Sequence, residues 1–391
     1  MRNSVRPDIP ARAPEITEGD RHTLFEEPVT VIEIGDSLAG AFCGRLLGQL
    51  GARVVKIEPP GGSPLRDLPP LLPGRETPVD DRTRARSAPY VAVNAGKEII
   101  TADLGSAAAR GVIEPILAGG GMAVMSGPLA EWVTQGLDPR QLGAKFPSAI
   151  FGRVTLFGED GPYADMAGGE LQVQALGGLM NMVGEPPREP LRIGGFPAQY
   201  STGLAMVTGF ALALYRRSNA GLGSSFSTSV LETVANIEWK GALSYQDNGR
   251  IVTRGSDGAP AILHARDGFF AFFYRPGDWP RVLAIMDDPR LESDKFSTQE
   301  ARTRNRPALL AILDECTSGM SKRELYHKTQ AQGMTTGYMA AMGELLTSEQ
   351  YQDRNFFTSV VVDGRTGVLP GPPWRMAGQP VGGAGSGVAR G

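Results

Sequence analysis

The stretch "VIEIGDSLAG", residues 31–40, decides the fold. The apolar run from Val29 to Ile34 stops at Gly35, and small residues lead into "AFCGRLLGQLGARVVKIE", which ends at Glu58. This order predicts a buried strand, a tight turn, a helix and a second strand. Dinucleotide-binding proteins have three glycines in such a turn and an acid after the second strand that binds a ribose hydroxyl.

The turn matches this glycine pattern only in part. Gly35 and Gly40 occupy the first and third places, and Ser37 stands in the middle. Since the middle glycine lets the backbone approach the pyrophosphate, Ser37 argues against a bound dinucleotide. Two interpretations stay open: a turn that holds another nucleotide-bearing ligand, and a turn in which both glycines only join a strand to a helix.

Composition excludes several classes of function. The chain has 391 residues, 41% hydrophobic and 21% charged, as expected for a globular protein of two domains. A net charge of −3 gives no basic footprint for nucleic acid. Two cysteines and three histidines, none spaced as a metal pair, predict neither a disulfide framework nor a metal site. With no signal-like or membrane-spanning apolar run, we expect a cytoplasmic protein without a membrane partner.

Strands and helices alternate through the first half of the chain. This alternation predicts an α/β fold with a Rossmann-like open parallel sheet. Between 171 and 215 the apolar positions recur at helical spacing, broken by a loop at 184–199. The predicted elements after Glu58 are a loop at 59–74, a strand at 90–104, a helix at 106–120, and strands at 122–125 and 148–158.

A change of composition near residue 250 indicates a smaller middle domain. It is expected to hold a hairpin at 265–275 and two or three amphipathic helices. A last β-like piece at 356–376 is expected to return to the first domain. The predicted organisation is a flexible arm at 1–24, a large domain at 25–225 completed by 347–378, linker helices at 226–255 with one helix over 227–247, a small domain at 256–346, and a flexible Gly-rich tail at 379–391.

Several longer stretches resemble one family. They are "VNAGKEIITADL", "GRVTLFGEDGPYADMAGGELQVQALGGLMNMVGEP", "DDPRLESDKFSTQEARTRNRPAL", "AQGMTTGYM", "LTSEQYQDRNFF" and "LPGPPWRM". With the opening stretch, they make the chain similar to the class III CoA-transferases over residues 25–378. That family includes formyl-CoA transferase, carnitine CoA-transferase and α-methylacyl-CoA racemase. The resemblance implies a Rossmann-like domain built from both ends of the chain, a smaller middle domain, and a dimer of interlocked rings.

The resemblance also implies covalent catalysis by a carboxylate. In the family, an Asp at the end of a Pro-Gly-Tyr-Asp stretch attacks an acyl-CoA thioester, which gives a mixed anhydride and CoA thiolate. The matching residues here are Ala167, Gly168, Gly169 and Glu170. Glu reaches roughly 1.5 Å further than Asp, and a displacement of about 1 Å can lower a rate on the order of a hundredfold. Glu170 is therefore either the catalytic nucleophile of an altered pocket or a cap for the helix that follows.

Coenzyme A, free or as acyl-CoA, is the substrate that the resemblance implies. Ser37, Leu38 and Ala39 match the turn that touches the adenine and ribose in relatives. Ala95 stands where the family has Arg, and "VMSGPL" lacks the family's phosphate-binding Arg. Lys97 is the cation that remains for a phosphate, or an ordinary surface lysine.

Three further residues are candidates for binding the second substrate, a small carboxylic acid. Arg192 is a candidate partner for its carboxylate. Gly194 and Gly195 either let the backbone approach the substrate or form a plain turn.

Three functions stay open. The first is transfer of CoA from an acyl-CoA, such as succinyl-CoA, to a carboxylic acid, in a homodimer or a heteromer with a homologous subunit. The second is a degenerate subunit of such a heteromer, as in benzylsuccinate CoA-transferases. The third is an acyl-CoA racemase or lyase, which the sequence disfavours because family racemases pair an Asp with an upstream His, and residues 120–170 contain none.

Overall fold

The computed structural model describes residues 25, 28–72, 86–185, 188–251, 254, 261–362, 365–376 and 379–380. These residues fall into two compact units. The smaller contains residues 254 and 261–348, and the larger contains the rest. The predicted arm at 1–24 and the tail after 380 lie outside the described residues.

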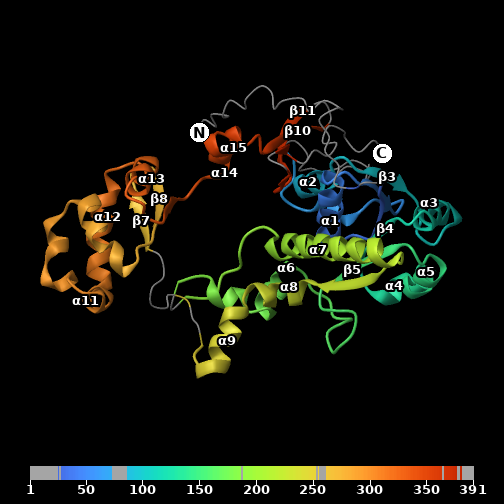
Figure 1. The fold of residues 1–391 in the computed structure, drawn as a ribbon, viewed down its shortest axis with the longest axis horizontal. Helices are drawn as coiled ribbons and strands as arrows, with labels where there is room; N and C mark the ends of the chain where they lie inside the picture. Colours follow the sequence, from blue (N-terminus) through green and yellow to red (C-terminus); the bar gives the residue numbers. More distant parts are fainter. Residues whose placement is uncertain are drawn as a thin grey trace. The chain divides into compact units, whose positions relative to one another are not determined.

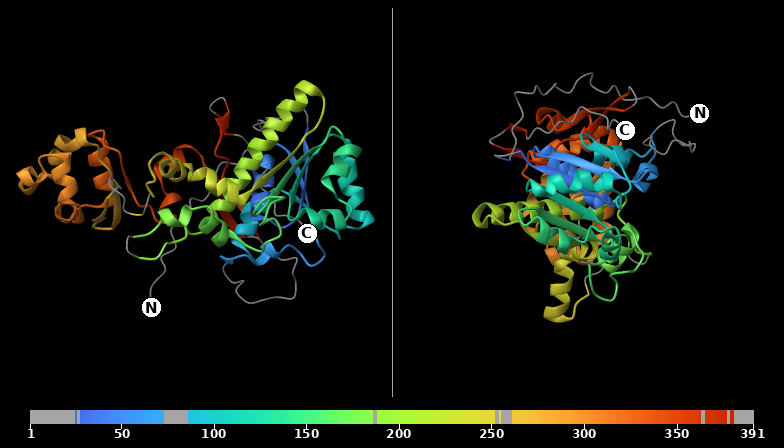
Figure 2. Two further views of the ribbon diagram at one scale, coloured as in Figure 1. Left: turned by 90° about the horizontal axis from the view of Figure 1, so that it is seen from below. Right: turned by 90° about the vertical axis from the view of Figure 1, so that its right-hand side faces the viewer.

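A six-stranded parallel sheet forms the centre of the larger unit (Figure 1). Its strand order is β3-β2-β1-β4-β5-β6, the order of a dinucleotide-binding fold, so the predicted α/β class and open parallel sheet are confirmed. Helices cover both faces of the sheet, α1 and α7 on one and α3, α4 and α5 on the other (Figure 2). The strands are β1 (Thr30–Ile34), β2 (Arg53–Glu58), β3 (Glu98–Thr101), β4 (Met122–Ser126), β5 (Ile150–Thr155) and β6 (Ser225–Ser229).

The remaining elements of this unit are helices, short 3-10 turns and two small hairpins. The helices are α1 (Leu38–Gln49), α2 (Ala88–Asn94), α3 (Ala107–Ala118), α4 (Leu129–Thr134), α5 (Pro139–Lys145), α6 (Glu170–Leu176), α7 (Pro197–Ala220), α8 (Val230–Ile237), α9 (Trp239–Asn248) and α15 (Glu349–Asp353), with 3-10 turns η2 (Pro64–Asp67) and η3 (Leu179–Met182). The hairpins are β10 (Phe357–Val362) with β11 (Arg365–Pro370), and β12 (Arg375–Met376) with β13 (Gln379–Pro380).

The opening stretch forms the predicted strand, turn and helix. Gly35 has φ +97°, and the Ser37 hydroxyl caps α1 by accepting a hydrogen bond of 3.0 Å from the Gly40 N–H. A Cβ at Gly35 would lie 2.1 Å from the Ser126 carbonyl oxygen, and a Cβ at Gly40 would lie 2.1 Å from the Ser126 Oγ. The close approach of the turn at Gly35 and of α1 at Gly40 to the end of β4 therefore explains both glycines.

Hydrophobic side chains from alternate strand positions pack on the two faces. Val31 and Val124 contribute to the core beneath α1 and α7, with Phe210 of α7. Ile32 and Met125 contribute to the core beneath α3, α4 and α5. A buried central sheet covered on both faces is the expected arrangement for parallel strands.

Two predicted elements are wrong. The predicted strand at 90–104 is α2 followed by the shorter β3. Ser87 caps α2 by accepting from the Tyr90 N–H at 3.0 Å, and Tyr90 and Val93 are buried at helical spacing. The predicted helix over 227–247 is also interrupted, because β6 occupies its start and two helices follow.

The smaller unit has its own sheet and core. A hairpin is present as predicted, but its first strand lies further upstream, and β9 joins as a third strand. Five α-helices are described there, where two or three were predicted. The elements are β7 (Ala261–Ala265), β8 (Gly268–Phe272), β9 (Thr336–Tyr338), α10 (Trp279–Met286), α11 (Gln299–Arg304), α12 (Arg306–Ser318), α13 (Lys322–Gln330) and α14 (Met342–Leu345), with η4 (Pro276–Asp278), η5 (Pro289–Glu292) and η6 (Asp294–Phe296).

The C-terminal segment packs on the larger unit. Arg45 of α1 donates a hydrogen bond of 2.8 Å from its Nη2 to the Pro370 carbonyl oxygen. Trp374 packs against the core beneath α1 and α7. Residues far apart in the sequence therefore complete one folded unit.

Candidate active site

A cavity of about 440 Å³ lies at the carboxyl edge of the parallel sheet. The strand order reverses between β1 and β4, and ligands of open α/β sheets bind outside the strands at such a point. Residues after both strands contribute to the cavity, with further residues from β5, α6 and α7. The lining residues are Asp36, Ser37, Leu38, Leu65, Leu68, Gly127, Pro128, Val154, Thr155, Leu156, Ala164, Met166, Gly168, Gly169, Glu170, Phe196, Gln199 and Val230.

Glu170 is a buried acid in the wall of this cavity, 9% exposed. Its Oε1 accepts hydrogen bonds from the Ala198 N–H at 2.9 Å and from the Gln174 Nε2 at 2.7 Å. Its Oε2 accepts from the Gln199 N–H at 3.3 Å. Burial and the neighbouring Glu170 charge raise the pKa of Tyr200. The carboxylate therefore lies at the N-terminus of α7, where helix N–H groups favour an anion.

Two amides that the sequence analysis did not predict hold this arrangement. Gln174 is fully buried one helical turn after Glu170, and its Oε1 accepts from the Ile193 N–H at 2.9 Å. The Gln199 Oε1 accepts from the Ala39 N–H at 3.3 Å, which ties the start of α7 to α1. The spacing of four residues between Glu170 and Gln174 is the one signal in the sequence for the first contact.

The predicted turn residues lie at different depths. Ser37 and Leu38 line the cavity, whereas Ala39 is fully buried and is not among the lining residues. A second cavity of about 360 Å³ shares Asp36, Ser37 and Gly127 with the first. Three carboxylates line this second cavity, those of Asp36, Asp103 and Glu131.

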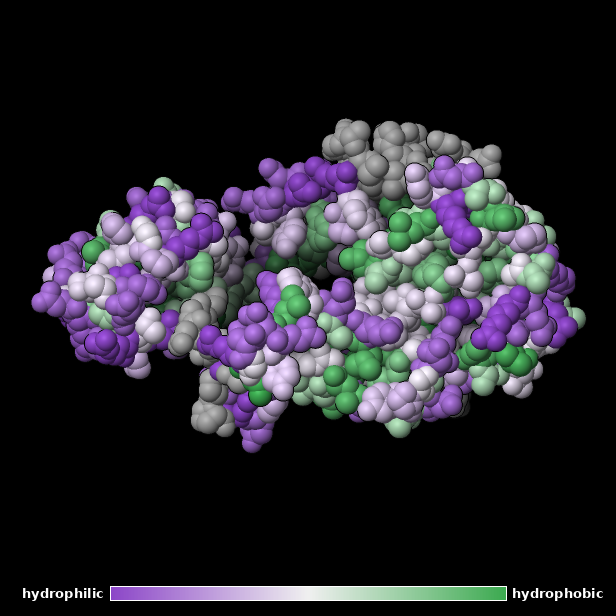
Figure 3. Space-filling view, turned by 60° about the horizontal axis from the view of Figure 1, so that its bottom comes forward, coloured by the Kyte–Doolittle hydropathy of each residue, from purple (hydrophilic) through white to green (hydrophobic). Residues whose placement is uncertain are grey.

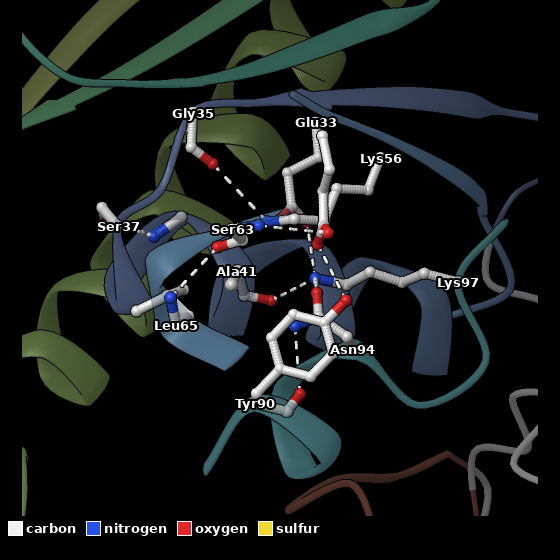
Figure 4. A network of polar contacts seen from close by, with 12 residues as sticks. Glu33, Gly35, Ser37, Ala41, Lys56, Ser63, Leu65, Tyr90, Asn94 and Lys97 are labelled. Atoms are coloured by element: carbon white, nitrogen blue, oxygen red, sulfur yellow. Dashed lines mark hydrogen bonds and ion pairs between the residues drawn. The ribbon is translucent and has the colours of Figure 1, made fainter. Parts of the chain in front are cut away.

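Lys97 lies in a buried polar network and not in either cavity lining (Figure 4). Its Nζ donates to the Glu33 Oε2 at 2.5 Å, the Ala41 carbonyl at 2.7 Å and the Asn94 Oδ1 at 3.0 Å. These three acceptors match the three donors of an ammonium group. Burial, outweighing the attraction of Glu33, lowers the pKa of Lys97 to about 8. Binding of a CoA phosphate by Lys97 stays a prediction, and the contacts of this lysine favour a structural role.

Glu58, the acid after β2, is also engaged within the chain. Its Oε2 accepts from the Arg66 Nε at 2.7 Å, and its Oε1 accepts from the Tyr90 hydroxyl at 2.8 Å. Burial and the Glu58 charge raise the pKa of Tyr90. Glu58 is 1% exposed, so the structure gives this acid internal partners in place of a ribose.

Arg192, Gly194 and Gly195 lie in an exposed loop before α7 and are not among the cavity-lining residues. The loop is tied to Glu170 indirectly, because Gln174 donates to both the Ile193 carbonyl at 3.2 Å and the Glu170 carboxylate. A Cβ at Gly194 or Gly195 would meet no atom within 4 Å, although Gly195 has φ +76°. Packing among the described residues therefore does not require glycine at 194.

Among the described residues, no group of three His, Cys, Asp or Glu side chains could hold a metal ion. In the same part of the chain, no helix is both long and apolar enough to cross a membrane.

Comparison with known proteins identifies the family of this site. The family model for CoA-transferase family III matches residues 27–385. The chain belongs to this family. The resemblance predicted from the sequence is thereby confirmed, and the protein is a class III CoA-transferase.

Known relatives are moderately similar to this chain over most of their own length and of its length. A succinate–glutarate CoA-transferase of Agrobacterium fabrum is 27% identical, over 93% of this chain and 89% of the relative. The BbsE subunit of a succinyl-CoA:(R)-benzylsuccinate CoA-transferase of Thauera aromatica is 26% identical, over 86% and 85%. A CAIB/BAIF family crystal structure from Brucella suis superposes with a TM-score of 0.77 at 27% identity, over 90% of this chain and 92% of that chain.

Proposed function

We propose that this chain transfers CoA from an acyl-CoA to a carboxylic acid, with Glu170 as the attacking carboxylate. The observation that carries the proposal is the position of Glu170 in the wall of the cavity at the carboxyl edge of the sheet. The relatives support CoA transfer between carboxylic acids, and succinyl-CoA is the donor in the name of the Thauera relative.

The exchange needs no net proton transfer. An oxygen of Glu170 attacks the thioester carbon, and the C–S bond breaks. The CoA thiolate leaves with the electron pair of that bond, and an acyl-glutamyl anhydride remains on the protein. The thiolate then attacks the Glu170 carbonyl carbon, which releases the donor acid as its carboxylate and leaves CoA on Glu170. The acceptor carboxylate reverses both steps and leaves as its acyl-CoA.

The surroundings of Glu170 are compatible with this role. An ionised carboxylate offers about four acceptor sites. The structure shows three hydrogen bonds to Glu170, so the carboxylate is oriented and retains one lone pair for attack. The same N–H donors stabilise the carboxylate when it is regenerated as a leaving group. Ser37 and Leu38, which line the same cavity, are proposed to contact CoA. Arg192, Gly194 and Gly195 are proposed to bind the carboxylic acid substrate.

The test is to trap an acyl-enzyme with hydroxylamine during incubation with acyl-CoA donors. Wild-type protein should form a hydroxamate on Glu170, and Glu170→Gln should form none. Glu232→Gln is the matched control, because Glu232 is an exposed acid in the first turn of α8 and lies outside the cavity lining. Full transfer activity in Glu170→Gln would refute the proposal.

A second candidate is a degenerate subunit that needs an active homologous chain. It is favoured by the capping of α7 by Glu170, which gives this acid a purely structural use, and by the Thauera relative, whose name describes a subunit. In that case the purified chain alone would form no acyl-enzyme, and activity would appear on co-expression with a homologous gene of the same organism.

We further propose that the chain forms the interlocked dimer of its family. Supporting this, large apolar side chains are exposed on the larger unit, as Figure 3 shows for one face. On α7 they include Leu212 and Tyr215, at 67% and 72% exposure, and on α9 Leu243 and Tyr245. Unpartnered apolar helix surfaces of this kind mark association sites. Native mass spectrometry of the chain, alone and co-expressed, distinguishes a homodimer from a heteromer, and a stable monomer would refute both.

A further inference from the structure

Resting on the proposed function, we propose that the side-chain amide of Gln199 is a catalytic hydrogen-bond donor to the thioester carbonyl oxygen when Glu170 attacks. Negative charge develops on that oxygen in the first step, and donors held in place for such an oxyanion contribute strongly to catalysis of acyl transfer. The donor is the Nε2 group of Gln199, which makes no hydrogen bond within the described part of the chain.

A hydrogen bond to α1 fixes the orientation of the Gln199 amide. The Ala39 N–H is a donor and needs an acceptor, so the amide oxygen of Gln199 faces α1, at 3.3 Å. The Nε2 group lies on the other side of the same planar amide and carries two donors. Gln199 lines the cavity and is 8% exposed. Its Nε2 is not one of the fully buried atoms without a partner, so this group is accessible from the cavity that the residue lines.

Gln199 lies between the two groups that the reaction brings together. Its backbone N–H donates to the Glu170 Oε2 at 3.3 Å. Its side-chain oxygen accepts from Ala39, the residue directly after Ser37 and Leu38, which are proposed to contact CoA. The thioester joins the acyl group that Glu170 attacks to the CoA that these residues contact. A thioester bound in this way therefore has its carbonyl group beside Gln199.

The hydrogen bonds of Glu170 distinguish its two oxygens. Oε1 accepts two, from the Gln174 Nε2 at 2.7 Å and the Ala198 N–H at 2.9 Å, whereas Oε2 accepts one of 3.3 Å from the Gln199 N–H. Oε2 is the less stabilised oxygen, so we assign it as the attacking atom. The tetrahedral intermediate then forms next to Gln199. On attack, the π electrons of the thioester carbonyl move to its oxygen, and they return when the C–S bond breaks, so Nε2 donates a hydrogen bond and transfers no proton.

The test replaces the carbonyl oxygen of the substrate by sulfur, which is a weak hydrogen-bond acceptor. Succinyl-CoA is compared with its dithioester analogue, in which sulfur replaces the oxygen of the thioester carbonyl. The rate constant for release of CoA from each donor is measured in a single turnover of the full chain. The ratio of the two rate constants gives the preference for oxygen over sulfur, and wild-type protein should show a clear preference.

Gln199→Met keeps the length of the side chain and removes its N–H donors. We expect CoA release from succinyl-CoA to slow on the order of a hundredfold, the usual effect of losing one oxyanion donor. Release from the dithioester should slow much less, so the preference for oxygen should shrink by about tenfold or more. A Gln199 that only ties α7 to α1 would affect both donors alike. A preference equal to that of wild type would therefore overturn the inference.

Two further variants complete the test. Gln172→Met is the matched control, because Gln172 is exposed on α6 and is not among the cavity-lining residues, and both rate constants should stay at their wild-type values. Gln199→Glu keeps an oxygen for the Ala39 N–H and, at a pH well above the usual pKa of a carboxyl, has no donor. It should lose the same preference, including in the case that Gln199→Met does not fold. A wild-type preference in Gln199→Glu would contradict the inference.

Hydroxylamine trapping separates this inference from the proposed function. If succinyl-CoA labels Glu170 in wild-type protein and the preference for oxygen is unchanged in the Gln199 variants, CoA transfer through Glu170 stands and the role of Gln199 fails. If no acyl-CoA donor labels Glu170 in wild-type protein, the proposed function fails and the role of Gln199 fails with it.

Discussion

The carboxylate of Glu170 accepts a hydrogen bond of 2.9 Å from the backbone N–H of Ala198, the second residue of α7. The first residue, Pro197, has no N–H, so Glu170 serves the first N–H groups that a helix leaves without internal partners. The acid that matches the family nucleophile therefore also completes the start of a 24-residue helix. Substitutions can separate these two uses.

Glu170→Asp restores the residue type of the family but shortens the side chain by one methylene. Because the contacts to Ala198 and Gln199 are built for Glu, we expect kcat to fall on the order of a hundredfold, as for a displacement of about 1 Å. The lost cap should also lower the free energy of unfolding by about 1 kcal/mol. Transfer kinetics and urea unfolding measure the two effects. An Asp variant as active as wild type would show that catalysis does not depend on the longer side chain of Glu170.

Gln174→Ala removes the amide that joins Glu170 to the loop at Ile193. The partly buried backbone N–H and carbonyl of Ile193 and one oxygen of Glu170 would lose their partner, which should destabilise the protein by about 1–3 kcal/mol. A lower kcat is expected as well, because Glu170 would be less well oriented. Gln172→Ala, an exposed position on the same helix, is the control and should change neither quantity. If Gln174→Ala keeps wild-type kcat, Gln174 has no positioning role.

The sequence predicted the entry to the fold better than its later elements. Val29 to Glu58 was predicted correctly because two apolar runs and the glycines of the turn between them all agree there. Residues 90–104 were misassigned because the β-branched and aromatic residues favour a strand, while the cap at Ser87 and the burial of Tyr90 and Val93 favour a helix. Strand β6 is polar and showed no apolar pattern in the sequence. It is an edge strand of the sheet and pairs only with β5.

The site was predictable in part for a similar reason. Glu170 was found from its place in a family motif, and the structure adds that it caps α7. The contacts of Gln174 and Gln199 depend on the packing of α6, α7 and α1 against one another, which no local pattern specifies. Lys97 was interpreted as a free cation because sequence spacing does not reveal Glu33, which lies 64 residues upstream and is its ion-pair partner.

Glu33 is the acid between two buried lysines, and its titration should affect stability. Burial alone would raise the pKa of Glu33, but Lys56 and Lys97 together lower it below the usual 4.5. Because the pKa of Glu33 is lowered in the folded state, its ionised carboxylate stabilises the fold above pH 4.5. This stabilisation is lost as the pH falls through the folded-state pKa of Glu33. Glu33→Gln should cost about 3–5 kcal/mol at neutral pH. In urea unfolding, this difference from wild type should shrink below pH 4.5, and a difference independent of pH would contradict the assignment.

Lys97→Met tests whether this lysine binds CoA or stabilises the fold. Since the ammonium already has three acceptors, we expect a lower Tm and a KM for acyl-CoA within about twofold of wild type, because loss of a charge-assisted phosphate contact would change KM by tenfold or more. Thermal melts and initial-rate kinetics on the same preparation give both values. A large rise in KM with an unchanged Tm would instead support the phosphate contact.

Gly40 and Ser126 should be coupled, because a Cβ at Gly40 would lie 2.1 Å from the Ser126 Oγ. Gly40→Ala alone should destabilise the protein by about 1–3 kcal/mol through overpacking. Ser126→Ala alone should be nearly neutral, since the buried Oγ has no hydrogen-bond partner among the described residues. In the double variant the nearest contacts become 3.4 Å to Val124 and 3.5 Å to the Cβ of residue 126, which are ordinary separations. Urea unfolding of the four proteins should therefore give a coupling of about 1 kcal/mol or more. Additive effects would mean that the glycine at position 40 serves the ligand and not the packing of α1 on β4.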